Sequence, residues 1–352
     1  MKLQNIKMEN VRGFTKKLIN LMDTESNQPL SAVVLLGDNG CGKSTVLKAI
    51  VHCLTTFNPA YGGELFDETD IHVGKDYMNI DLEVSFNDVE LKQLTSESGS
   101  KIIIEKLSVG KHTRGDKPTD YYLIHDDNES ANVTEDFHEF LNVFKSPSFD
   151  GALIFYFDTF RFLPKIKIDG PNANPSPQNV KEKSLASSVL NNETVNNKFL
   201  QVKQWLVNLD FKRLKNPTYE NEADFDHVIN SFNMLFSPYS FSTIADNGDI
   251  LFTHNSEIIE MNKLSDGFKN ILIIVGEIFY RLYLSNTKHQ RFYEKEAIIL
   301  IDEIDCHLHP KWQINLVSYL KQLFPNCQFI VTTHSPIILT NMRECEIIRL
   351  EG

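Results

Sequence analysis

The chain has 352 residues, of which 41% are hydrophobic and 23% charged, a composition ordinary for a soluble globular protein of one large domain or two. Its formal net charge of −12 argues against a surface coated with basic residues for nucleic acid, while leaving room for a local basic groove. The five cysteines form no C-x-x-C pair and are interpreted as reduced thiols, and no apolar run is long enough for a signal peptide or a membrane span. We therefore expect a cytoplasmic protein with no membrane contact.

The N-terminal part of the chain contains short segments in which apolar and polar residues alternate. Residues 1–8 show this pattern, and residues 18–22 are suited to pair with them. Residues 80–86 alternate cleanly, and residues 102–107 and 121–124 predict further strands. Antiparallel strands of this kind predict a side sheet that packs against a main parallel sheet.

A phosphate-binding loop lies between the first two of these strands and the later ones. Residues 32–36 are apolar and rich in β-branched side chains, as in a buried strand, and residues 37–44 then read G-D-N-G-C-G-K-S. Glycines let such a turn wrap closely, and N–H groups at the start of the following helix attract phosphates. Lys43 is expected to reach the β- and γ-phosphates, and the Ser44 hydroxyl to bind Mg²⁺. The predicted nucleotide contacts in this loop are Asp38, Asn39, Gly40, Cys41, Gly42, Lys43, Ser44 and Thr45.

The middle of the chain predicts an inserted helical subdomain. Residues 153–157 indicate another buried strand, and residues 164–184 carry Pro, Asn and Lys residues typical of a surface loop. Helical periodicity follows over residues 185–209 and around 225–236, without the sustained heptads of a coiled coil. Residues 241–252 then indicate a β-hairpin.

The second chemical motif is a pair of acidic residues. Asp302 and Glu303 directly follow an apolar run at residues 297–301. A carboxylate at the end of a buried strand can lie beside the Mg²⁺ held by Ser44, which is the role predicted for Asp302. Glu303 is then placed to polarise the attacking water. Read alone, the pair could equally be the solvated acidic end of a core strand, but the phosphate loop upstream favours the catalytic interpretation.

Two further segments of the sequence are candidates for nucleotide contacts. An amphipathic helix is predicted over residues 312–324, followed by a strand at 328–333 that ends in His334, where ligands gather in parallel sheets. We predict that His334 contacts the γ-phosphate or the catalytic water. Upstream, Ser265 and Gly267 begin a strongly apolar helix, a pattern that fits either an anion-binding site or an ordinary helix cap.

Along the chain these four elements come in the order phosphate loop, Ser265–Gly267 segment, Asp302–Glu303 pair and His334. In this order they resemble an ABC-type ATPase and more narrowly the SMC, RecF and OLD-nuclease group. The stretch I-K-M-E-N-V-R-G-F at residues 6–14 is similar to the start of that group, in which the arginine, here Arg12, approaches the nucleotide. The stretches D-E-I-D-C-H-L-H-P at residues 302–310 and T-T-H-S-P at 332–336 closely resemble the compact ATPases of OLD, Gabija and Septu-type prokaryotic defence systems.

The resemblance implies an α/β P-loop NTPase head domain of ABC type, with a mainly parallel core sheet, an antiparallel side sheet and an inserted helical lid subdomain. The expected boundaries are 1–163 for an N-terminal ATPase lobe, 164–240 for the helical subdomain and 241–352 for a C-terminal lobe. It also implies a homodimer that sandwiches two ATP molecules, in which Ser265 and Gly267 contact the γ-phosphate bound by the other subunit.

Two departures from the family pattern bear on activity. Asp266 stands where transporter-type signatures have glycine, and residues 158–161 read D-T-F-R where many relatives carry a Mg²⁺-contacting glutamine. Both are compatible with slow hydrolysis. They also make a transporter ATPase the weaker interpretation.

The resulting functional prediction is an ATP- and Mg²⁺-dependent ATPase that controls a separate effector protein, a nuclease or a toxin, in anti-phage defence. The separate effector is expected because no nuclease motif is found in the sequence. Two alternatives remain: a nucleotide-gated scaffold in which turnover is incidental, and a RecF-like DNA repair ATPase. The latter would bind nucleic acid with strong salt dependence.

Overall fold

The structure is a computed structural model that describes residues 1–55, 66–94, 106–112, 151, 153–159, 193–245, 248–286 and 291–351. The strand predicted at 121–124 and the loop predicted at 164–184 lie outside the described residues. The same holds for the first residues of the predicted strand at 102–107 and of the predicted helix at 185–209.

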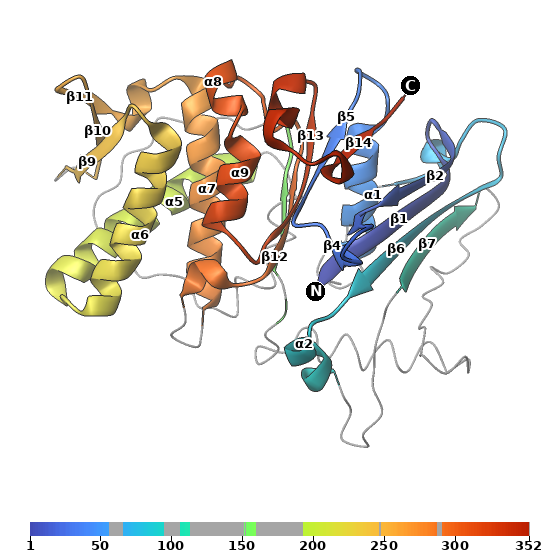
Figure 1. Cartoon of the computed structure of the whole chain (residues 1–352), viewed down its shortest axis with the longest axis horizontal. Coiled ribbons are helices and arrows are strands. Elements are labelled where there is room, and N and C mark those ends of the chain that lie inside the picture. Colours follow the sequence, from blue (N-terminus) through green and yellow to red (C-terminus); the bar gives the residue numbers. More distant parts are fainter. Residues whose placement is uncertain are drawn as a thin grey trace.

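A five-stranded parallel sheet forms the centre of the molecule (Figure 1). All of its neighbouring strands run parallel, and their order is β14 (Ile347–Arg349), β5 (Ala32–Leu36), β13 (Gln328–Thr333), β12 (Ala297–Ile301) and β8 (Leu153–Phe157). The strands predicted at 32–36, 153–157, 297–301 and 328–333 are confirmed with these bounds. Both faces of the sheet are covered, which explains why these strands are almost wholly apolar.

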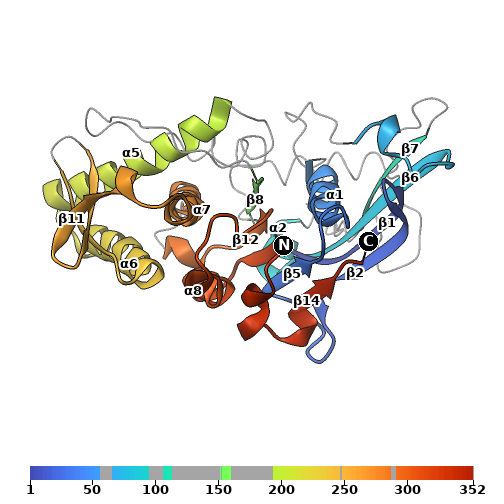
Figure 2. The ribbon, with the colours of Figure 1, turned by 90° about the horizontal axis from the view of Figure 1, so that it is seen from above.

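Alternate residues of each central strand enter two different hydrophobic cores. In β12, Ala297, Ile299 and Ile301 face one core and Ile298 and Leu300 face the other. The first core is formed with α5 (Glu193–Lys215), α6 (Tyr219–Phe236), α7 (Asp266–Ser285) and α9 (Leu316–Leu323). The second is formed with α1 (Lys43–Thr55) and the antiparallel sheet, which Figure 2 shows on the opposite side from α5, α6 and α7.

The predicted antiparallel side sheet is present. Its strand order is β2 (Phe14–Asn20), β1 (Lys2–Val11), β6 (Tyr77–Ser85) and β7 (Lys106–His112). The predicted pairing of the first two strands is confirmed, and Val11 pairs with Phe14 across a two-residue turn. Arg12, in that turn, has a φ of 48°, the left-handed conformation that tight hairpins require.

A separate three-stranded sheet lies beside α6. It consists of β9 (Ser240–Ile244), β10 (Ile250–His254) and β11 (Glu257–Glu260). The antiparallel pairing of β9 with β10 confirms the predicted hairpin. The third strand, β11, was not anticipated.

The prediction of a single helix over residues 312–324 is wrong, because the structure has two helices in this region. These are α8 (Pro310–Gln313) and α9, separated by Ile314 and Asn315. The side chain of Asn341 donates to the carbonyl oxygen of Ile314 at 3.2 Å and to Oδ1 of Asn315 at 2.7 Å. A side chain from a distant segment therefore supplies a donor to the Ile314 carbonyl at the break between the two helices.

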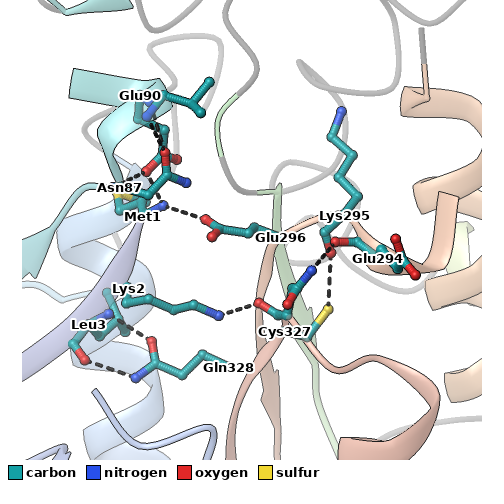
Figure 3. A network of polar contacts seen from close by, with 12 residues as sticks. Met1, Lys2, Leu3, Asn87, Glu90, Glu294, Lys295, Glu296, Cys327 and Gln328 are labelled. Atoms are coloured by element: carbon teal, nitrogen blue, oxygen red, sulfur yellow. Dashed lines mark hydrogen bonds and ion pairs between the residues drawn. The ribbon is translucent and has the colours of Figure 1, made fainter. Parts of the chain in front are cut away.

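A polar network joins the antiparallel sheet to the parallel sheet (Figure 3). The Leu3 N–H donates to Oε1 of Gln328 at 2.7 Å, and Nε2 of Gln328 donates to the Leu3 carbonyl at 2.9 Å. Lys2 donates to the Asn326 carbonyl, and Glu90, in α2 (Asp88–Gln93), and Glu296 both accept from the amino group of Met1. The buried amide of Gln328 thus acts as an additional strand partner for β1.

Replacing Gln328 by leucine should lower the free energy of unfolding by about 2–4 kcal/mol, because it leaves a buried N–H and a buried carbonyl of Leu3 unpaired. Urea unfolding followed by circular dichroism measures the change. Gln28→Leu, at an exposed position of β4 (Gln28–Pro29), is the matched control and should change stability by less than about 0.5 kcal/mol. Equal stability of the two variants would contradict a structural role for the Gln328 amide.

Two chemical expectations from the sequence concern cysteines and membranes. The described cysteines are all free, and burial raises the pKa of the Cys327 thiol to about 12, so that it stays protonated.

Among the helices that the structure describes, none has the length and apolarity needed to cross a bilayer.

Candidate nucleotide site

The phosphate loop joins β5 to α1, as predicted. Gly40 and Gly42 have φ values of 83° and 95°, a region that glycine enters without steric cost. The side chain of Lys43 is turned back along the loop, and its Nζ donates to the carbonyls of Gly37 at 2.7 Å and Asp38 at 2.8 Å. The loop therefore surrounds the ammonium group with backbone oxygens, at the place where phosphate oxygens are predicted to bind.

The ring of Phe14 covers the outside of this loop. A Cβ added to Gly42 would lie 2.3 Å from Cζ of Phe14, which is closer than any real contact. Gly42 is thus favoured by its backbone conformation, and a side chain at this position would also displace the ring of Phe14.

The central strands bring the sequence motifs to one edge of the sheet. β13 lies between β5 and β12, and the register pairs Thr333 with Leu36 on one side and Val331 with Ile301 on the other. Because all three strands run in the same direction, the residues that follow them emerge together. The phosphate loop, His334 and the Asp302–Glu303 pair therefore share this edge.

His334 lies between the two charged motifs. Its Nδ1 is 3.4 Å from Nζ of Lys43, and its Nε2 is 3.9 Å from Oε1 of Glu303. An ammonium group only donates hydrogen bonds, so Nδ1 of the imidazole faces Lys43 as an acceptor, while Nε2 faces the carboxylate. Lys43, His334 and Glu303 thus form a continuous row across the ends of the strands.

Asp302 and Glu303 differ in their surroundings. Asp302 is buried, and its carboxylate accepts from the Thr332 hydroxyl at 2.5 Å and lies 3.4 Å from the Thr159 hydroxyl. Glu303 is partly exposed and has a φ of 46°, a conformation that costs a non-glycine residue about 1–2 kcal/mol. Such a cost is typical of residues held in place for function.

The donor set fits a magnesium ion that is shared with phosphates. Asp302 supplies one carboxylate, and Ser44, at the start of α1, supplies a hydroxyl. Mg²⁺ is commonly bound by one or two protein oxygens together with substrate phosphates and water. In the part of the chain that the structure describes, no cluster of three His, Cys, Asp or Glu side chains could hold a metal without such help.

The predicted signature residues lie at the start of α7. Ser265 caps the helix, its side chain accepting from the Phe268 N–H at 3.4 Å, and it is exposed. Gly267 is buried against the loop after Glu303, where an added Cβ would lie 2.0 Å from the carbonyl oxygen of His307. Asn270 donates to the carbonyl of Cys306 in the same loop at 3.1 Å. The signature segment is therefore packed onto the loop that follows the Asp–Glu pair.

The side chain of Arg12 contacts residues outside the phosphate loop. Its Nε donates to Oδ1 of Asp70 at 2.6 Å, and its guanidinium lies 5.2 Å from the centre of the Phe66 ring. Over the described ranges, the side chains of Arg12 and Ser265 form no hydrogen bond or ion pair with residues 37–45. Within one subunit, the structure thus brings together Lys43, Asp302, Glu303 and His334, but not Arg12 or Ser265.

Sequence reasoning missed two residues at this edge, Thr332 and Thr159, whose hydroxyls both approach Asp302. Thr159 lies in residues 158–161, where this chain departs from the family pattern. That departure is the sequence signal by which Thr159 could have been found. For Thr332 the signal was a polar residue near the end of an otherwise apolar strand.

A phosphate loop, an Asp–Glu pair and a histidine on adjacent parallel strands, with an antiparallel sheet on one side, define the α/β fold of a P-loop ATPase. The chain belongs to the AAA ATPase domain family, which it matches over residues 1–339.

Individual relatives support this placement. The Retron Ec83 probable ATPase of Escherichia coli is 26% identical over an alignment of 380 positions, which covers 96% of this chain and 69% of that protein. The Septu protein PtuA of Bacillus mycoides (strain KBAB4) is 35% identical over 131 residues, 36% of this chain and 18% of the relative. Among solved structures, an SMC head bound to the C-terminal winged-helix domain of ScpA superposes with a TM-score of 0.52. The superposition covers 98% of this chain and 95% of the other, with 15% sequence identity. At this identity the similarity shows the fold alone.

Proposed function

We propose that this chain binds ATP with Mg²⁺, hydrolyses it to ADP and phosphate, and closes as a homodimer around two ATP molecules. The observation that carries the proposal is the position of His334 between Lys43 and Glu303. A lysine for the phosphates and a carboxylate for water are thereby held on either side of one imidazole, where a γ-phosphate and its attacking water would both be in reach.

Each residue at the edge then has a role. Lys43 exchanges its hydrogen bonds to the Gly37 and Asp38 carbonyls for phosphate oxygens. Ser44 and Asp302 would hold the metal, which would supply positive charge to the phosphate oxygens when bound. Glu303 accepts a proton from the attacking water, and the Nε2–H of His334 steadies that water or the γ-phosphate.

The proposed dimer uses the signature segment of the opposite subunit. Ser265 is exposed at the N-terminus of a helix that runs from Asp266 to Ser285, and helix N-termini attract anions. Gly267 and Asn270 fix this helix start to the loop after Glu303. ATP that bridges two subunits stabilises only the closed state, so binding would favour the dimer and hydrolysis would release it.

In the cell, the proposed role is anti-phage defence through a separate effector protein, a nuclease or a toxin. Its support is the similarity to the retron ATPase and to PtuA, together with the motif resemblance in residues 302–310 and 332–336. The net charge of −12 favours a protein partner over a broad nucleic-acid surface.

The proposal is tested by comparing the wild type with Lys43→Ala and with Lys48→Ala, a partly exposed position on the same helix. Fluorescent ATP binding and mass in solution are measured with and without Mg²⁺. We expect the wild type and Lys48→Ala to bind ATP and shift from monomer to dimer. Lys43→Ala should bind at least about tenfold more weakly, because it loses a charge-assisted hydrogen bond worth about 1.5–3 kcal/mol, and should stay monomeric. A wild-type mass unaffected by ATP would refute the ATP-driven dimer.

A further inference from the structure

The buried hydroxyl of Thr332 is bonded to both acidic residues of the proposed site. Thr332 lies in β13 and is 0% exposed, and its Oγ1 is 2.5 Å from Oδ1 of Asp302 and 2.7 Å from the backbone nitrogen of Glu303. The carbonyl of Thr332 also accepts from the Ile304 N–H at 3.0 Å. One residue of the neighbouring strand therefore anchors three consecutive residues after β12.

The direction of these hydrogen bonds is fixed by chemistry. An ionised carboxylate only accepts and a backbone N–H only donates, so the hydroxyl must give its proton to Asp302 and accept from Glu303. No other arrangement of that proton satisfies all the groups. The hydroxyl thus orients the Asp302 carboxylate and, at the same time, holds the backbone of Glu303.

The backbone of Glu303 needs such support. Its φ of 46° lies in the left-handed region, which a residue with a Cβ adopts only at an energetic cost. The buried hydrogen bond from the Glu303 N–H to the Thr332 hydroxyl stabilises this conformation and so offsets part of that cost. The left-handed conformation in turn directs the Glu303 side chain toward His334, 3.9 Å away.

We propose that Thr332 is a positioning residue that sets the orientation of the magnesium-binding carboxylate of Asp302 and of the general base Glu303. This inference rests on the proposed function, since it assigns Asp302 and Glu303 the roles given above. It adds that the response of the site to Mg²⁺ depends on a hydroxyl that acts through Asp302 and Glu303.

The strand offers a matched control in the next residue. Thr333 is also buried, and its hydroxyl donates to Oδ1 of Asp305 at 2.6 Å and accepts from the Ser335 N–H at 2.9 Å. Thr333→Val therefore removes a hydroxyl of the same kind, with the same two kinds of partner, away from Asp302 and Glu303.

The experiment measures the dissociation constant of a fluorescent, non-hydrolysable ATP analogue in EDTA and over a range of Mg²⁺ concentrations, together with phosphate release from ATP. We expect Thr332→Val to need about 10–100-fold more Mg²⁺ for half-maximal tightening and to lose turnover by a similar factor, with unchanged affinity in EDTA. Thr332→Ser, which keeps the hydroxyl and loses the methyl group, should stay within about threefold of the wild type, as should Thr333→Val.

A comparison of the losses in Thr332→Val and Thr332→Ser distinguishes a positioning role of Thr332 from a packing role. Valine preserves the volume of threonine and serine does not, so a packing role would make Thr332→Ser the worse variant, which would overturn the proposal. A Mg²⁺ response in Thr332→Val equal to that of the wild type, or an equal loss in Thr333→Val, would also overturn it. A wild-type protein that binds no nucleotide would instead refute the proposed function itself.

Discussion

Replacing Glu303 by glutamine should lower the rate of ATP hydrolysis by about 10²–10⁴-fold, the range contributed by a positioned general base. Glutamine has nearly the same shape but cannot accept the proton of the attacking water. Nucleotide binding should persist, because Lys43 and the phosphate loop are untouched. The proposed closed dimer should then accumulate with ATP and Mg²⁺, which phosphate release and mass in solution measure together.

The control for this change is Glu257→Gln, which removes an exposed carboxylate at the start of β11. It should hydrolyse ATP at the wild-type rate. Unreduced turnover in Glu303→Gln would exclude this residue as the base. Loss of turnover without any effect on biological activity would favour the nucleotide-gated scaffold.

The second large effect is expected at Gly267. Helix propensity alone favours Gly267→Ala by about 1 kcal/mol, because alanine is the better helix former. The added Cβ would, however, lie 2.0 Å from the His307 carbonyl oxygen, a backbone atom that cannot rotate away. Such overpacking costs about 1–3 kcal/mol, so the steric term outweighs the propensity. We expect a lower free energy of unfolding and loss of the ATP-dependent dimer, with nucleotide binding retained.

Urea unfolding, fluorescent ATP binding and light scattering test this expectation. Gly110→Ala is the matched control, since its added Cβ would meet its nearest atoms at an ordinary 3.5 Å. A Gly267→Ala protein that dimerises with ATP as the wild type does would show that the packing of α7 on the loop at His307 has no part in assembly.

The core of the fold could be predicted because its signals are local. Strands buried on both faces are continuous apolar runs, so β8, β12 and β13 are visible in the sequence with their bounds. The phosphate loop is likewise a contiguous pattern. Adjacent parallel strands then place Asp302 and His334 together by topology alone.

What could not be predicted depends on contacts between distant segments. The break between α8 and α9 is associated with Asn341, and the β1 connection is made by Gln328, which is 325 residues from Leu3. The hydroxyl of Thr332 reaches Asp302 only because of the register between β13 and β12. No periodicity within one segment carries such information.

The contact between Phe14 and Gly42 has a mechanical consequence. The ring belongs to the hairpin that begins the antiparallel sheet, and it lies against Gly42 of the phosphate loop. The loop cannot widen toward that side unless the Phe14 ring turns aside or the hairpin moves with it. The ring therefore forms one wall of the candidate nucleotide site, and it ties the first hairpin of the chain to the phosphate loop.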